Sequence, residues 1–170
     1  VVKMLLAHDG IEANKSTTDD GATPLYTACN QGHVEAVRTL LADGRADIEK
    51  ANQDGDTPLH TSAWIGHLLC AQLLVIHGAS LSAKDTNGET AAESASVNDQ
   101  PLLAEWLTAV TGWSHLRVAA GCRLYTDAAV ALRLGRMDPD ADDTQHPAAM
   151  VQELMAAIAT SKAAPAALPW

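Results

Sequence analysis

The chain has 170 residues, of which 47% are hydrophobic and only 4% are aromatic, and it contains no Phe. Its formal net charge of −10 argues against nucleic acid or an anionic membrane as a partner and favours a neutral or basic protein surface. The sequence has no apolar run of the roughly 18 residues that a membrane span needs, and no signal-peptide pattern. We therefore expect an intracellular, cytoplasmic protein.

Residues 1–20 are predicted to hold the end of a helix and a loop after it. Four apolar residues lie on one stripe at helical spacing: Val1, Val2, Leu5 and Leu6. The helix that should pack against this stripe is missing from the sequence. We expect that the chain is a fragment of a longer protein or that its first structural unit is partial.

Residues 21–53 are predicted to form a complete helix–turn–helix unit. Asp20-Gly21 favours a turn, because Gly adopts positive φ without steric cost. Thr23 can cap the following helix, and Pro24 suits the first helical position, where its missing N–H costs nothing. Apolar residues then mark an inner and an outer helix: Leu25, Ala28 and Cys29, then Val34, Val37, Leu40 and Leu41.

Residues 54–86 repeat this pattern most clearly, with Thr57-Pro58-Leu59-His60 at the start of one helix and Gly66-His67 after its end. The glycines before the units recur at spacings of 34 and 33 residues: Gly21, Gly55 and Gly88. The motif and its period resemble the ankyrin-repeat signature T-P-L-H-x-A. The resemblance implies an all-α ankyrin-repeat solenoid, built from helix–turn–helix repeats with β-turn fingers.

The rest of the chain departs from the signature step by step. Residues 87–111 are predicted to form a shortened repeat without a following finger, and Pro101 opens its outer helix. The apolar face of that helix is predicted to hold Leu102, Leu103, Trp106, Leu107 and Val110. Residues 112–143 keep the period but not the motif, and we predict a degenerate repeat there. A C-terminal capping helix is predicted at 146–162 and a flexible tail at 163–170.

No pattern for chemistry is present. The sequence lacks the G-x-S-x-G, P-loop and G-x-G-x-x-G motifs, so we predict no catalytic or cofactor-binding residues, no cofactor and no enzyme activity. One set of residues could suggest a metal but does not match known zinc spacings: His60, His67, Cys70 and His77. The ankyrin resemblance implies instead that the motif histidines bond backbone and neighbouring repeats. Three cysteines without paired spacing are expected to be reduced thiols: Cys29, Cys70 and Cys122.

The informative site is predicted to be a surface. In ankyrin repeats the fingers and inner helices line a concave face, and residues there that the fold does not need are available to partners. By register, the predicted partner-binding residues are Asp20, Ala22, Asn30, Gln31, Asp54, Asp56, Trp64, Ile65, Glu89 and Asn98. The finger tips among them are acidic. Trp64 is either a binding hot spot or a ring that packs between repeats on Tyr26 or Trp106.

These observations predict a non-catalytic scaffold or adaptor, a monomer, that binds a protein partner on its concave face. The alternative is a targeting or regulatory ankyrin segment of a larger enzyme, ubiquitin-ligase adaptor or channel, whose functional domain lies outside this sequence. A further possibility is a spacer between other domains, which would have no binding hot spot.

Overall fold

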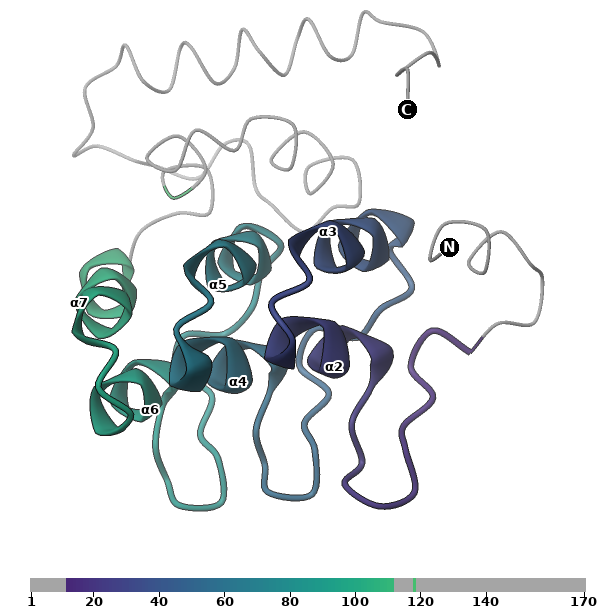
Figure 1. Cartoon of the computed structure of the whole chain (residues 1–170), viewed down its shortest axis with the longest axis horizontal. Coiled ribbons are helices and arrows are strands. Elements are labelled where there is room, and N and C mark those ends of the chain that lie inside the picture. Colours follow the sequence, from purple (N-terminus) through teal and green to yellow (C-terminus); the bar gives the residue numbers. More distant parts are fainter. Residues whose placement is uncertain (1–11, 112–117, 119–170) are drawn as a thin grey trace, which may run out of the picture.

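The computed structural model of the chain describes residues 12–111 and residue 118 (Figure 1). The described part is built from helices without strands, as predicted for an all-α repeat solenoid. Its six helices form three consecutive pairs: α2 (Pro24–Asn30) and α3 (Val34–Asp43), α4 (Pro58–Ile65) and α5 (Leu68–Ile76), α6 (Ala91–Val97) and α7 (Pro101–Val110). The predicted degenerate repeat at 112–143, capping helix at 146–162 and tail at 163–170 lie outside the described residues, apart from residue 118.

The helix pairs stack in two layers. Helices α2, α4 and α6 lie side by side in one layer, and the outer helices α3, α5 and α7 pack against it (Figure 1). Long loops descend from the inner layer at each junction between pairs and form the fingers. Among the described residues, no helix is both long enough and apolar enough to cross a membrane.

A threonine cap starts each inner helix. The hydroxyl groups of Thr23, Thr57 and Thr90 each accept a hydrogen bond from the backbone N–H three residues later. In α4 and α6 the third helical residue, His60 or Glu93, also accepts from the backbone N–H of the cap, which completes a capping box. The helix starts predicted from the Thr-Pro pairs of α2 and α4 are confirmed.

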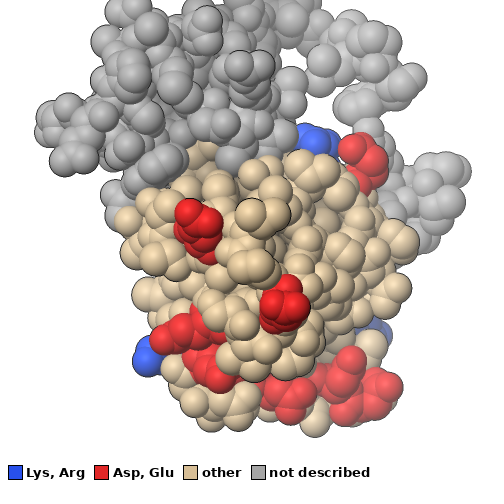
Figure 2. Space-filling view, turned by 60° about the vertical axis from the view of Figure 1, so that its left-hand side comes forward, with Lys and Arg blue, Asp and Glu red and all other residues tan. Residues whose placement is uncertain are grey.

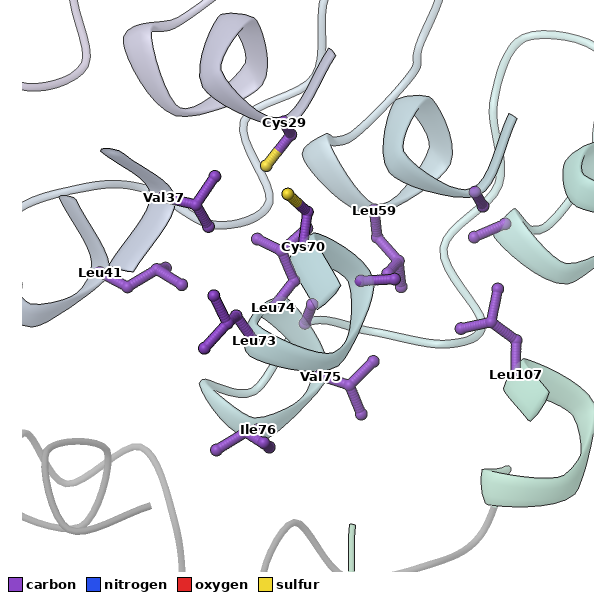
Figure 3. Packing of buried hydrophobic residues seen from close by; sticks show 14 of the residues in the cluster. Cys29, Val37, Leu41, Leu59, Cys70, Leu73, Leu74, Val75, Ile76 and Leu107 are labelled. Atoms are coloured by element: carbon purple, nitrogen blue, oxygen red, sulfur yellow. The ribbon is translucent and has the colours of Figure 1, made fainter. Parts of the chain in front are cut away.

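The core lies between the two layers and is centred on α5. Leu73, Leu74, Val75 and Ile76 are each at most 1% exposed. Figure 3 shows α5 with residues of α3 on one side and Leu107 of α7 on the other. Burying a side chain of this size contributes about 1.5–3 kcal/mol. Helix α4 packs against both α2 and α6, and so joins the three pairs into one solenoid beside this core.

The two described cysteines belong to this core. Cys29 of α2 and Cys70 of α5 are buried free thiols, and Figure 3 shows their sulfur atoms directed towards one another. Burial raises the pKa of the Cys29 thiol to about 12, so it stays protonated at neutral pH. Cys122 lies outside the described residues.

The predicted apolar face of α7 is wrong at one residue. Leu103, Leu107 and Val110 are buried and Trp106 is partly buried, but Leu102 is 81% exposed. Successive helical residues are turned by about 100°, so the residue before Leu103 points away from the face that Leu103 shares with Leu107. Leu102 therefore projects into solvent at the start of the helix.

The fingers are closed by their own backbone and joined to one another. Asn52 N–H donates to the Asp56 carbonyl oxygen, and Asp85 N–H to that of Glu89, each at 3.0 Å. Between neighbouring fingers, Gln53 N–H donates to the Asp20 carbonyl oxygen at 3.0 Å. Equivalently, the backbone N–H of Thr86 donates to the carbonyl oxygen of Asp54 at 3.1 Å. This finger ladder holds the loops edge to edge below the inner helices.

Candidate functional site: a groove between the fingers and the inner helices

An open groove of about 440 Å³ lies where the fingers meet the inner helices. Two aromatic residues line it, Tyr26 of α2 and Trp64 of α4. Four acidic residues of two neighbouring fingers line it as well: Asp54, Asp56, Asp85 and Glu89. The groove therefore combines aromatic surface with negative charge on the face of the solenoid predicted to bind partners.

The groove carboxylates have no cationic partner in the part of the chain that the structure describes. The ion pairs found there join other residues: Lys15 with Glu12, Arg38 with Glu35, and Arg45 with Asp43. Figure 2 shows the acidic side chains gathered along the lower edge of the described surface, where the fingers lie. The groove is thus an acidic surface whose charge the described residues leave uncompensated.

The surroundings shift the pKa values of two groove residues. Partial burial raises the pKa of Asp56; the neighbouring His60 opposes this shift, and the charges of Asp85 and Asp54 add to it. Burial likewise raises the pKa of Tyr26, and nearby carboxylates, that of Asp56 foremost, raise it further. Both shifts have the sign expected where negative charges gather in a partly desolvated site.

His60 and Tyr26 occupy the same register position but do different work. His60 is 1% exposed, and each of its two ring nitrogens has a hydrogen-bond partner. Its Nδ1 lies 2.8 Å from the Thr57 hydroxyl, and its Nε2 lies 3.1 Å from the carbonyl oxygen of Glu89 in the next repeat. Because a carbonyl only accepts, Nε2 carries the hydrogen. The prediction that motif histidines bond backbone and neighbouring repeats is confirmed for His60.

Tyr26 makes neither of these contacts. It is half-buried, and its hydroxyl accepts a hydrogen bond of 3.2 Å from the Asn52 side chain in the following finger. The second motif histidine, His67, behaves as predicted, because its Nε2 lies 3.2 Å from the Asn30 carbonyl oxygen of the preceding repeat. Tyr26 therefore presents its ring to the groove, while the motif histidines hold the repeats together.

Half of the predicted partner-binding residues line the groove. They are Asn30, Asp54, Asp56, Trp64 and Glu89. Trp64 is 45% exposed and the neighbouring Ile65 is 36% exposed. Gln31 is exposed but lies outside the groove, and its side chain donates to the Asn30 side chain at 3.0 Å.

Four of the predicted partner-binding residues take part in the fold itself: Asp20, Ala22, Asn30 and Asn98. Ala22 is only 5% exposed, so it offers no surface to a partner. Its N–H donates to the carboxylate of Asp20, which also accepts from Thr17 and so closes the turn of its own finger. The Thr17 bond is the main cause of the lowered pKa of Asp20.

The other two residues tie neighbouring repeats together. The Asn30 side chain donates to the Thr61 hydroxyl at 3.0 Å. The Asn98 side chain donates to the Trp64 carbonyl oxygen at 2.6 Å. Both bonds join one repeat to the next. The position of a residue within its own repeat does not predict such a bond. The expectation that the fold leaves these asparagines unused is therefore wrong.

Sequence reasoning missed Tyr26 and Asp85 as groove residues. The sequence signal for Tyr26 was that it stands where the repeat motif has His. A Tyr at this position does not complete the capping box as His60 does, so its ring is available to the groove. Asp85 matches Asn52 in register, and the two side chains cap equivalent finger turns. Partial burial acts to raise the pKa of Asp85, but hydrogen bonds from Glu89 and Asn87 outweigh it and hold this pKa below its usual value. A comparison of the finger turns would have found it.

Apolar surface adjoins the groove at the turns between inner and outer helices. Among the described residues, every exposed large hydrophobic side chain lies in one of two short segments, 64–69 or 97–102. They are Trp64, Ile65, Leu68, Leu69, Val97 and Leu102. Trp64 belongs both to this turn edge and to the groove, so the two surfaces are continuous.

Stacked helix pairs with hairpin fingers define a helical-repeat solenoid, a class of protein that presents one extended face. The chain matches the family model described as ankyrin repeats (3 copies), over residues 1–85 and 44–112. It therefore belongs to the ankyrin-repeat family. A comparison with curated proteins gave no match. Ankyrin repeats are in general protein–protein interaction modules and are typically non-catalytic.

Proposed function

We propose that this chain is a non-catalytic scaffold or adaptor that binds a protein partner across the face formed by its fingers and inner helices. It acts inside the cell as a monomer, and its partner presents a neutral or basic surface. The observation that carries the proposal is Trp64, which lines the groove while 45% of its surface is exposed. Large aromatic side chains exposed beside a cavity are typical of interaction hot spots.

Two further features support this face over the outer helices. The groove carboxylates lack cationic partners among the described residues. The apolar turn edge continues from Trp64 to Ile65, so a partner can bury apolar surface beside the acidic fingers. An apolar anchor with a charged surround is a common arrangement in protein interfaces.

The test is Trp64→Ala in the full chain, with a partner first captured from cell extract and identified by mass spectrometry. We expect the affinity for that partner to fall by about 2 kcal/mol, or roughly thirtyfold, as for other hot-spot aromatic residues. Glu105→Ala is the control, because it truncates an exposed side chain of α7 that lies outside both the groove and the apolar turn edge. A large fall in melting temperature with unchanged affinity would show that Trp64 serves packing between repeats.

A further inference from the structure

The groove has a chemistry that selects among protein partners. Its carboxylates sit on a preset backbone: Asp54 and Asp56 N–H groups donate to the Asn52 side chain at 3.0 and 2.8 Å. In the next finger, Glu89 N–H donates to the Asp85 carboxylate at 2.8 Å. These bonds fix the finger turns before any partner arrives, so little ordering cost remains for binding.

The acidic residues of the groove come from two neighbouring fingers, Asp54 and Asp56 from one and Asp85 and Glu89 from the next. Among the described residues, no three His, Cys, Asp or Glu side chains stand close enough to hold a metal ion together. A cationic side chain, unlike a metal ion, needs only one carboxylate beside its charge. Arginine and lysine carry such a charge at the end of a long apolar stem.

The aromatic residues suit the same occupant. Cations bind favourably against the faces of Trp and Tyr rings, and the methylene stem of the cationic side chain covers apolar surface. Tyr26 and Trp64 line the groove together with Asp56, which is half-buried. A cation attracts a half-buried carboxylate more strongly than a fully exposed one, because the effective dielectric around it is lower, and Asp54 and Asp85 add to the attraction.

We propose that this groove receives the cationic side chain of an arginine or lysine from the partner protein, with Tyr26 and Trp64 beside its stem and Asp56 beside its charge. This inference rests on the proposed function and names the chemistry by which the partner is recognised. The turn edge places an apolar residue of the partner next to that cation, since Ile65 follows Trp64 at the end of α4.

The experiment uses the full chain and a random dodecapeptide library displayed on phage. We expect the enriched peptides to share an arginine or lysine at one fixed position. Changing that residue to Gln in a synthetic peptide should weaken binding about tenfold, the loss of a charge-assisted contact. Asp56→Asn in the chain should weaken the cationic peptide to a similar degree but leave the Gln peptide unaffected.

Glu105→Gln is the control for net charge, because Glu105 is exposed on α7 and is not a groove residue. It should leave peptide affinity unchanged. Equal losses for Asp56→Asn and Glu105→Gln would overturn the proposal, since they would indicate only long-range attraction. Enrichment of peptides without a shared cation, or of none, would also overturn it. If Trp64→Ala still weakens the captured partner in that case, the proposed function stands and only the cationic occupant is wrong.

Discussion

Helices α2 and α4 hold equivalent places in successive repeats but use their residues differently. Both begin with a Thr-Pro pair and bury the Leu that follows it. At the third helical position α4 has His60, buried between repeats, whereas α2 has Tyr26 at the groove. At its end, α4 exposes Trp64-Ile65, where α2 has Asn30-Gln31. The comparison teaches that the Thr-Pro-Leu start serves the fold in both helices, while the third position and the last positions differ and set the chemistry at the groove.

The largest expected effect separates His60 from Tyr26. His60→Ala should lower the free energy of unfolding by about 3 kcal/mol, because it empties a buried site and breaks the contacts to Thr57 and Glu89. Tyr26→Phe removes one hydroxyl contact and should cost at most about 1 kcal/mol. Urea denaturation of both variants measures the two losses. Equal losses would show that the two positions do not divide fold from surface.

The next effect compares the fingers that precede the two helices. Gly55 has φ of +78°, and a Cβ there would lie 2.8 Å from the backbone nitrogen of Thr86 in the next finger. Gly21 has a similar φ of +75°, but its nearest neighbour would be the Gln53 side chain at 3.3 Å. Since both share the cost of left-handed backbone, about 1 kcal/mol, Gly55→Ala should cost about 1 kcal/mol more than Gly21→Ala.

Chemical denaturation of the two alanine variants measures this difference. Gly88→Ala supplies the baseline, because Gly88 has φ of +81° and open space around its added Cβ. The excess cost of Gly55→Ala over this baseline is the price of separating two fingers. If all three variants lose the same stability, the fingers do not constrain one another.

The smallest effect concerns two capping boxes of different chemistry, His60 in α4 and Glu93 in α6. The Glu93 carboxylate accepts hydrogen bonds from the Thr90 backbone N–H and from the Thr90 hydroxyl. The backbone bond is the larger of the two causes that lower the pKa of Glu93 below its usual 4.5. A lowered folded-state pKa contributes stability that is present above the unfolded value and is lost as the pH falls through the folded value. Acidification should therefore weaken the α6 cap.

The measurement is the urea midpoint from about pH 6 down to about pH 3, for the natural chain and for Glu93→Gln. Gln retains an acceptor for the Thr90 N–H but does not titrate in this range. The difference between the two chains should shrink as the pH falls, since the natural chain alone loses a charge. A constant difference across the pH range would show that the charge of Glu93 does not contribute to the cap.

Much of the fold could be predicted from local patterns. Thr57 with Pro58 marked the start of α4, and the period of the glycines placed the other inner helices. Apolar spacing identified most of the core. These signals succeed because a cap, a turn and an amphipathic face each depend on residues only a few positions apart in the chain.

The groove could be predicted only in part, because its walls come from different repeats. Trp64 and the finger aspartates were found by asking which positions the motif leaves variable. Tyr26 lines the groove because the following finger lies beneath α2, and the sequence of one repeat does not show this contact. Asn98 was misjudged for the same reason, since its bond to the Trp64 carbonyl oxygen crosses to the preceding repeat. Contacts between repeats depend on stacking, which no single repeat encodes.

The finger ladder has a consequence for how the solenoid opens. In a stack of repeats, stability is the sum of the repeats and of the contacts between neighbours. The groove takes residues from α2, α4 and the fingers beyond them, so an occupant grips several repeats at once. Bound partner would thus slow amide hydrogen exchange at Gln53 and Thr86, whose N–H groups join neighbouring fingers. A bound partner would therefore make unfolding more cooperative, because single repeats would fray less and the repeats would unfold more nearly together.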